Sequence, residues 1–98
     1  MNEKLRKFKK ILRSEMPKLE SEYDVETLEL FGSYVKNSQK KGSDLDILVT
    51  FKITPGLFKY IQLENYLSDI LGIKVDLVMR SALKPNIGKI ILSEAVPL

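Results

Sequence analysis

The sequence contains no cysteine and no histidine. Without cysteine, the chain has no thiolate nucleophile, no disulfide bond and no cysteine-based metal site. Without histidine, it has no Ser-His-Asp triad, no imidazole proton shuttle and none of the usual zinc or copper ligands. Any catalysis would therefore depend on carboxylates, lysine or arginine, hydroxyl groups, backbone amides, or a hard metal ion bound through oxygen.

Long hydrophobic runs are also missing. No apolar run approaches the roughly 20 residues that span a bilayer, and no apolar segment follows the N-terminal charges as it would in a secretory signal. We therefore expect a cytoplasmic protein with no membrane partner. The chain has 98 residues, 44% of them apolar and 30% charged, which predicts a single globular domain over residues 1–98.

Positive charge is confined to one segment. The net charge is +3, but residues 1–13 carry six cations against one acid, and the rest of the chain is mildly acidic. This pattern is compatible with a solvated helix face, with docking on an acidic partner, or with nucleic-acid contact. Because Phe8 is the only aromatic residue in this run, we do not expect direct nucleic-acid binding.

Hydrophobic periodicity predicts three long helices and three strands. Proline at position 17 is expected to end or kink the first helix, because it lacks an amide donor. The resulting fold class is α/β (α+β), with a small mixed β-sheet flanked by helices. The expected helices are 3–16 with a further turn at 18–23, 57–71 and 86–95, and the expected strands are 25–31, 44–51 and 73–79.

Three aspartates are the most informative side chains. Asp44 and Asp46 are two residues apart in an expected strand, so their side chains should project from the same face. Two adjacent carboxylates repel each other unless a cation lies between them, and hard cations such as Mg²⁺ prefer oxygen ligands. Asp76 lies in the last expected strand among apolar neighbours, where a solitary charge is costly unless it is paired or linked to a metal.

Gly32 and Ser33 follow the first expected strand. Glycine allows a sharp bend and a close approach to a ligand, and amides at the start of a following turn can hold phosphate oxygens. Each signal alone has a simpler interpretation: Asp-x-Asp is often a solvated strand end, Asp76 an edge-strand acid, and Gly-Ser ordinary turn chemistry. Together they describe a triphosphate site. Arg80, just after the third strand, could reach this site or remain a surface cation.

The pattern Gly32-Ser33-x10-Asp44-x-Asp46 resembles the signature of the DNA polymerase β-type nucleotidyltransferase superfamily. From about residue 3 to the C-terminus, the chain is similar to its minimal nucleotidyltransferases (MNT proteins), the antitoxin partners of HEPN toxins. The segments that carry this resemblance are Leu30-Phe31-Gly32-Ser33-Tyr34, Ser43-Asp44-Leu45-Asp46-Ile47-Leu48-Val49, Pro55-Gly56-Leu57-Phe58, Lys74-Val75-Asp76-Leu77-Val78 and Ala82-Leu83-Lys84-Pro85.

The resemblance implies a palm-like mixed sheet that binds ATP with two Mg²⁺ ions. By the family pattern, Asp44 and Asp46 ligate the metals, and Asp76 is a third ligand that also helps to deprotonate the acceptor hydroxyl. The implied reaction is in-line attack of a hydroxyl on the α-phosphorus of ATP, with pyrophosphate as the leaving group. Such chemistry requires neither histidine nor cysteine.

The same resemblance assigns nucleotide contacts to Gly32, Ser33, Lys36 and Ser43. Many relatives continue Gly-Ser-x-Ala-Arg-Gly, whereas this chain has Lys36 and Asn37 at the last two positions. Lysine keeps the positive charge but loses the bidentate fork of arginine. Asparagine can adopt the left-handed conformation that glycine would allow, at some cost. We expect the departure to affect nucleotide affinity rather than the metal site.

Three functional hypotheses follow. The first is an adenylyltransferase antitoxin that transfers AMP from ATP to a hydroxyl, a tyrosine by expectation, of a HEPN-family ribonuclease toxin. The second is a binding antitoxin that neutralises the toxin by occlusion without catalysis. The third is an enzyme that modifies a small hydroxylated substrate or an RNA end, which the lack of a separate acceptor domain argues against.

Overall fold

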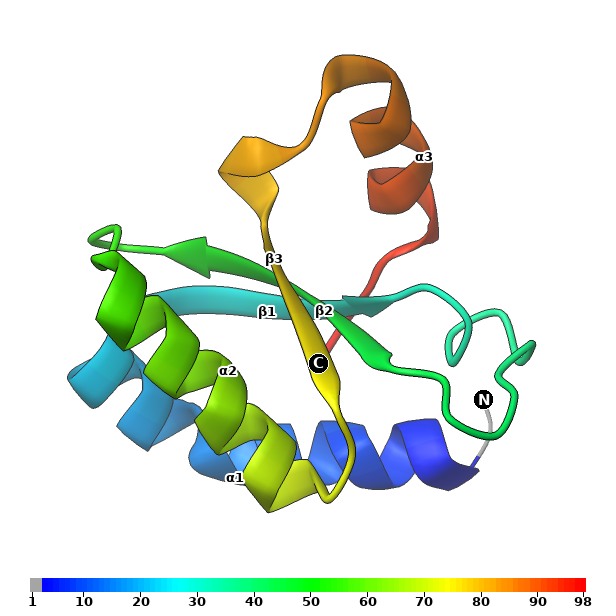
Figure 1. The fold of residues 1–98 in the computed structure, drawn as a ribbon, viewed down its shortest axis with the longest axis horizontal. Coiled ribbons are helices and arrows are strands. Elements are labelled where there is room, and N and C mark those ends of the chain that lie inside the picture. Colours follow the sequence, from blue (N-terminus) through cyan, green and yellow to red (C-terminus); the bar gives the residue numbers. More distant parts are fainter. Residues whose placement is uncertain (1–2) are drawn as a thin grey trace.

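The structure is a computed structural model that describes residues 3–98. Helices and strands follow one another in nearly the expected order (Figure 1), with a short fourth strand that the sequence pattern does not reveal. The elements are α1 (Glu3–Tyr23), β1 (Val25–Phe31), β2 (Leu45–Phe51), α2 (Leu57–Leu71), β3 (Val75–Met79), the 3₁₀ turn η1 (Arg80–Ala82), α3 (Pro85–Glu94) and β4 (Val96–Pro97).

The four strands form one mixed sheet in the order β3-β2-β1-β4. Strand β2 pairs antiparallel with β1 and parallel with β3, while β4 pairs antiparallel with the end of β1. The parallel pair needs a crossover connection, and α2 provides it. The expected small mixed sheet with flanking helices is therefore confirmed, and β3 is one of its edge strands.

One face of the sheet carries the hydrophobic core. Alternate residues of β2 (Leu45, Ile47 and Val49) are almost fully buried against α1 and α2, together with Leu30 of β1 and Leu77 of β3. Because side chains alternate across a strand, the residues between them project from the opposite face. That opposite face, which we call the open face, therefore carries Asp46 and Asp76.

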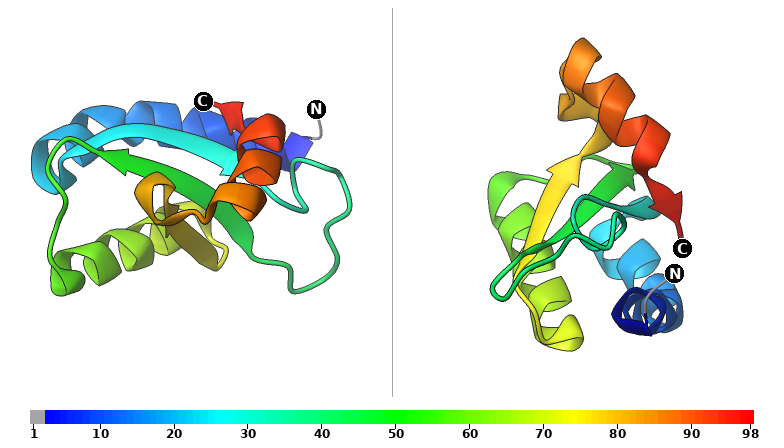
Figure 2. Two further views of the ribbon diagram at one scale, coloured as in Figure 1. Left: turned by 90° about the horizontal axis from the view of Figure 1, so that it is seen from above. Right: turned by 90° about the vertical axis from the view of Figure 1, so that its right-hand side faces the viewer.

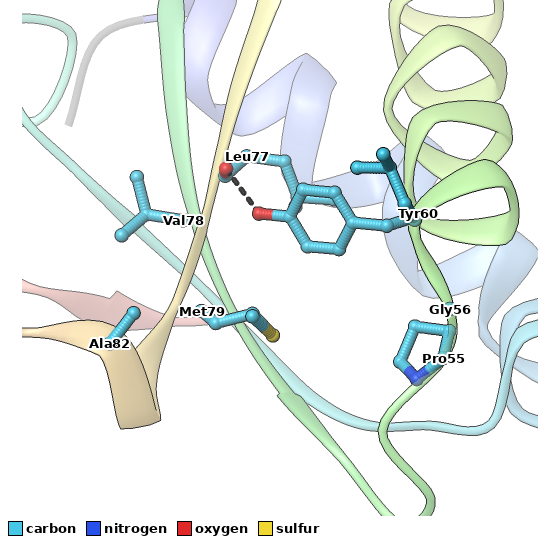
Figure 3. A pocket seen from close by; sticks show the side chains of 8 residues that line it. Pro55, Gly56, Tyr60, Leu77, Val78, Met79 and Ala82 are labelled. Atoms are coloured by element: carbon cyan, nitrogen blue, oxygen red, sulfur yellow. Dashed lines mark hydrogen bonds between the residues drawn. The ribbon is translucent and has the colours of Figure 1, made fainter.

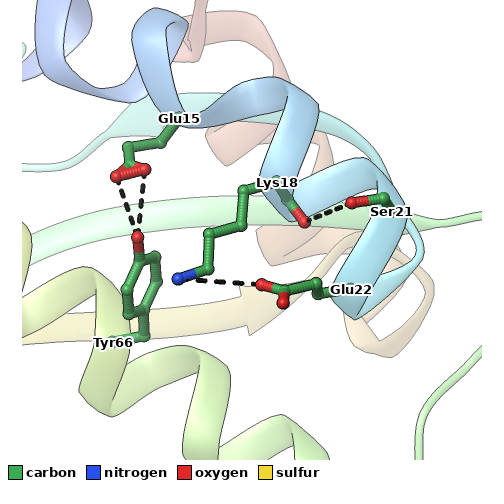
Figure 4. A network of polar contacts seen from close by, with 5 residues as sticks. All are labelled: Glu15, Lys18, Ser21, Glu22 and Tyr66. Carbon is green, nitrogen blue, oxygen red and sulfur yellow. Dashed lines mark hydrogen bonds and ion pairs between the residues drawn. The ribbon is translucent and has the colours of Figure 1, made fainter.

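Helices α1 and α2 pack side by side beneath the sheet, and a polar cluster ties them together (Figure 4). The hydroxyl of Tyr66 on α2 donates hydrogen bonds to both carboxylate oxygens of Glu15 on α1, at 2.8 and 3.0 Å. The ammonium of Lys18 lies 4.3 Å from the centroid of the Tyr66 ring and 3.7 Å from Glu22. These contacts fix the helix layer that supports β2 and β3.

The sequence predicts that Pro17 ends or kinks the first helix and that 18–23 form a further helical turn. Helix α1 does not end at Pro17 but continues to Tyr23, so the expected helical turn is confirmed as part of the same helix. Leu12 before the proline and Leu19 after it are both fully buried in the core, so burial on both sides holds the helix together. Of the six N-terminal cations, Lys9 is buried, while the other five, Lys4, Arg6, Lys7, Lys10 and Arg13, are exposed.

Helix α3 lies on the other side of the sheet from α1 and α2 (Figure 2). Gly88 is its one buried residue, and a Cβ atom added there would come within 3.1 Å of the Leu83 side chain. Ile87 and Ile90 are exposed on this helix. Within residues 3–98, no helix has the length and apolar character required to cross a membrane.

Replacing Pro17 with alanine should stabilise the fold. The substitution restores an amide that can bond within α1 and removes the clash of the proline ring with the preceding turn, at a site exposed to solvent. We expect the free energy of unfolding to rise by up to about 3 kcal/mol. Urea unfolding of Pro17→Ala and the wild type measures this; a decrease would show that the fold requires the proline.

Candidate active site

Two carboxylates face each other on the open face of the sheet. In the parallel pairing of β2 with β3, Asp46 lies in register with Asp76. On its other side, Asp46 pairs with Phe31 at the end of β1. The sequence prediction treats Asp76 as a charge among apolar neighbours, but those neighbours point into the core while Asp76 itself is exposed. Strand alternation thus removes the expected burial penalty and leaves the repulsion by Asp46.

The pKa of Asp46 is raised both by burial and by this repulsion. Burial, and then the carboxylates of Asp76 and Asp44, raise the pKa of Asp46 from 3.8 to about 6. Within residues 3–98, no lysine or arginine forms an ion pair with Asp46 or Asp76. A pair of facing carboxylates without a protein cation is the kind of oxygen donor set that a hard divalent cation such as Mg²⁺ prefers.

Asp44 stands apart from this pair. It precedes β2 and its carboxylate lies 4.0 Å from the ammonium of Lys74. Among the described residues, no group of three or more acidic side chains converges closely enough to hold a metal ion as it stands. The donor pair of Asp46 and Asp76 therefore fits a cation, while Asp44 is paired with Lys74 and does not join them in a group of three.

Gly32 brings the chain directly against Asp46. Its φ of +81° lies in the left-handed region, and a Cβ atom added there would lie 2.0 Å from Oδ2 of Asp46. Only glycine meets both constraints without strain. The next residues turn tightly, because the amides of Val35 and Lys36 both donate to the Gly32 carbonyl at 3.1 Å. The expected sharp bend after β1 is confirmed, and it places this turn beside the carboxylate pair.

The other predicted nucleotide contacts have local partners. Lys36 forms an ion pair with Glu94 at the end of α3, with 3.0 Å between nitrogen and oxygen. The Ser43 hydroxyl accepts a hydrogen bond from the Lys40 amide at 2.8 Å, which closes the loop before Asp44. The carbonyl of Ser33 accepts the Ser38 amide at 2.9 Å. All three side chains belong to the segment that joins β1 to β2 on the Asp46 side.

Two further residues of this turn, Asn37 and Tyr34, have structural roles next to the site. Asn37 has φ of +58°, so it adopts the left-handed conformation that its place in the motif requires. Tyr34 is buried and its ring meets the Phe8 ring edge-on, with 5.7 Å between centroids. Tyr34 is therefore a packing residue that anchors the turn to the N-terminal part of α1.

Arg80 belongs to the open face and is not an isolated surface cation. Its guanidinium lies 3.8 Å from the carboxylate of Glu29. Glu29 and Val78 flank Leu48 in the sheet, and Leu48 is almost fully buried although it points away from the main core. The ion pair between Glu29 and Arg80 could not be predicted from the sequence, because a charged residue in an expected strand is usually interpreted as exposed to solvent.

An apolar cavity of about 460 Å³ lies beside β3 (Figure 3). It is lined by the loop before α2, by Tyr60 of α2 and by Leu77, Val78 and Met79 of β3. The Tyr60 hydroxyl donates a hydrogen bond to the Leu77 carbonyl, and burial raises the pKa of Tyr60 to about 12. Tyr60 thus keeps its proton and contacts the backbone next to Asp76, a role that its place in an amphipathic helix pattern does not predict.

Comparison with known proteins decides the family. The model of the nucleotidyltransferase domain matches residues 5–98, nearly the whole chain. The chain belongs to the nucleotidyltransferase family. This confirms the resemblance drawn from the Gly-Ser and Asp-x-Asp motifs, and it makes the protein an enzyme of the nucleotidyltransferase class.

Relatives and solved structures agree with this membership. The protein adenylyltransferase MntA of Thermococcus cleftensis is 45% identical over 92 residues, which cover 94% of this chain and 93% of that protein. A solved candidate minimal nucleotidyltransferase superposes with a TM-score of 0.75 at 30% identity, covering 91% of both chains. A toxin–antitoxin crystal structure with AMP-PNP gives a TM-score of 0.67 at 26% identity, covering 90% of this chain and 66% of that one.

Replacing Gly32 with alanine should damage the site of this nucleotidyltransferase specifically through Asp46. The positive φ alone costs about 1–2 kcal/mol for alanine, and the contact with the Asp46 carboxylate adds to it. We expect part of the lost stability to return in the double variant Gly32→Ala/Asp46→Ala, because that background removes the two atoms nearest to the added Cβ, Oδ2 and Cγ of Asp46. Urea unfolding of the four proteins measures the coupling; strictly additive losses would contradict the contact.

Stability should depend on pH through Asp46. Its pKa is higher in the folded than in the unfolded protein, so the folded state loses stability as pH rises from about 4 to about 6. Without metal, Asp46→Asn should raise Tm by a few degrees, on the order of 5 °C, above pH 6 and by less below pH 4.

Thermal unfolding in EDTA across this pH range measures the difference. Asp69→Asn, at an exposed carboxylate on α2, is the matched control and should show no such trend. A Tm difference for Asp46→Asn that stays constant with pH would contradict the assignment.

Proposed function

We propose that this protein transfers AMP from ATP to the hydroxyl of a tyrosine on a HEPN-family toxin. This modification would inactivate the toxin. The observation that carries the proposal is the Asp46–Asp76 pair. The two residues lie in register on the open face, and the Gly32 backbone lies directly against the Asp46 carboxylate. The sequence identity between this chain and the protein adenylyltransferase MntA supports the proposal. The structural similarity of this chain to a toxin–antitoxin structure with AMP-PNP supports it as well.

In this proposal, Asp46 and Asp76 would hold Mg²⁺, and Asp44 would join them, with two ions in the complete site. Bound Mg²⁺ would neutralise the carboxylates and the negative charge of the triphosphate. The turn at Gly32 and Ser33, with Lys36 and Ser43, would hold the phosphates beside the pair. Ser43 would do so from the loop that directly precedes Asp44.

The chain's own groups account for the proton and the leaving group. A carboxylate oxygen of Asp76, exposed at the sheet edge, accepts the proton of the acceptor hydroxyl. The acceptor oxygen then forms a bond to the α-phosphorus of ATP, while the bond from that phosphorus to the β-phosphate oxygen breaks. Pyrophosphate leaves with the electron pair of the broken bond, and Lys36 offsets its charge.

Two ion pairs would have to break when the substrate binds. Lys74 must release Asp44, and Glu94 must release Lys36. Both pairs are solvent-exposed, with side chains between 36% and 81% accessible, and such pairs contribute only about 0–1 kcal/mol. A triphosphate with its cation offers both partners a stronger electrostatic interaction, so the exchange costs little.

Intact-mass measurement tests the proposal. Mixing the protein with ATP, Mg²⁺ and the toxin should add the mass of one or more AMP groups to the toxin. Asp46→Ala should reduce the rate at least about 100-fold, because it removes half of the charged pair. Asp69→Ala, a carboxylate outside the site, should leave it unchanged. Modification that persists in Asp46→Ala would refute the assignment.

A second candidate function is neutralisation by occlusion without catalysis. It is favoured by the separation of Asp44 from the other two aspartates in the described residues. In this case the double variant Asp44→Asn/Asp46→Asn would protect cells from the toxin as well as the wild type does. Loss of protection in a double variant that still binds the toxin would exclude occlusion as the sufficient mechanism.

A further inference from the structure

Strand β3 lies at the edge of the sheet, with one side paired to β2. The backbone groups on the free side of an edge strand normally face solvent or invite pairing with another chain. Here three side chains of α2 cover them. Tyr60, Glu64 and Ser68 are spaced four residues apart, so they form one stripe along the helix; we call them the α2 ladder.

Each member of the α2 ladder bonds to a backbone group that flanks Asp76. Glu64 accepts the Leu77 amide at 2.9 Å, and Ser68 accepts the Val75 amide at 3.0 Å. The Tyr60 hydroxyl donates to the Leu77 carbonyl (Figure 3). The ladder therefore holds the chain on both sides of Asp76 from the outer edge of the sheet.

A second hydrogen bond orients the Ser68 side chain of the α2 ladder. The Ser68 hydroxyl donates to the Glu64 carbonyl at 2.9 Å while it accepts the Val75 amide, so its orientation is defined by two bonds. A carboxylate oxygen of Glu64 is the acceptor for the Leu77 amide, so this bond reaches β3 directly from the helix. Near Tyr60 the cavity beside β3 leaves the strand with less apolar packing, so the hydrogen bonds matter more there.

We propose that the α2 ladder positions Asp76 for cation binding by holding β3 against the repulsion between Asp76 and Asp46. This inference rests on the proposed function for the use of the cation. An edge strand is held by one neighbour only, and like charges in register push β3 outward, away from β2. The ladder opposes that displacement at the two residues adjacent to Asp76.

Protection of the edge from aggregation is the simpler interpretation of such bonds. It predicts the same loss of stability when a bond is removed, but no change in cation binding. Two measurements therefore distinguish the interpretations. One is the metal affinity of a folded variant that lacks the bond, and the other is whether a conservative replacement that keeps the hydrogen-bond acceptor restores that affinity.

The test compares Glu64→Ala, which removes the acceptor, with Glu64→Gln, which keeps one. Asn65→Ala is the exposed control on the same helix, and Ile11→Ala on α1 is the control for lost stability. Mn²⁺ titration followed by electron paramagnetic resonance gives the affinity. Amide hydrogen exchange at Val75 and Leu77 reports the strand, and AMP transfer to the toxin is measured in parallel.

We expect Glu64→Ala to weaken Mn²⁺ binding about tenfold, the effect of one hydrogen bond, and to speed exchange at Leu77. Glu64→Gln should stay within about twofold of the wild type, and both controls should bind Mn²⁺ normally. If Glu64→Ala does not fold, Ser68→Ala is the replacement, with the same expected direction and Val75 as the reporter.

Unchanged Mn²⁺ affinity in folded Glu64→Ala would overturn the proposal, as would an equal loss in Ile11→Ala at matched Tm. Absence of Mn²⁺ binding by the wild type would overturn it too. If the wild type binds Mn²⁺ but transfers no AMP, the proposed function fails alone, and the Mn²⁺ and exchange measurements still decide the role of the α2 ladder.

Discussion

Electrostatic repulsion between Asp46 and Asp76 is the constraint on which the rest of this structure depends. Parallel pairing of β2 with β3 puts the two carboxylates in register on neighbouring strands, which lie about 4.8 Å apart. Two unit charges 4 Å apart repel by about 4 kcal/mol at an effective dielectric constant of 20. Burial raises the pKa of Asp46, and this repulsion raises it further. A fold that retains such a pair gains nothing from it in stability, so its value lies in what the pair binds.

The surrounding architecture holds that pair in place. The core of β2 packs on α1 and α2 and keeps Asp46 on the opposite face. Gly32 closes one side, because any larger residue would collide with the Asp46 carboxylate. On the other side, Glu64 of α2 bonds to the strand that carries Asp76. Together these contacts hold two carboxylates without a protein cation beside the turn that begins at Gly32, an arrangement that a metal–triphosphate substrate complements.

Much of this could be predicted from the sequence. Periodicity gave the helices and the three longer strands, and the motif around Gly32 gave the family. The helical turn at 18–23 was expected, but its union with 3–16 into one helix could not be predicted, because it depends on burial of Leu12 and Leu19 on both sides of Pro17. Strand β4 is two residues long and carries no periodic signal. The α2 ladder was hidden because polar residues spaced four apart usually mark a solvated helix face, and the pairing of Asp44 with Lys74 depends on a register that spacing alone does not determine.

A crystal structure with Mn²⁺ and a non-hydrolysable ATP analogue tests the central claim most directly. The account predicts an anomalous peak within ligand distance of both Asp46 and Asp76, with the triphosphate against the turn at Gly32 and with Asp44 turned away from Lys74. A nucleotide bound elsewhere on the chain, with Asp46 and Asp76 still facing each other and no metal between them, would contradict it.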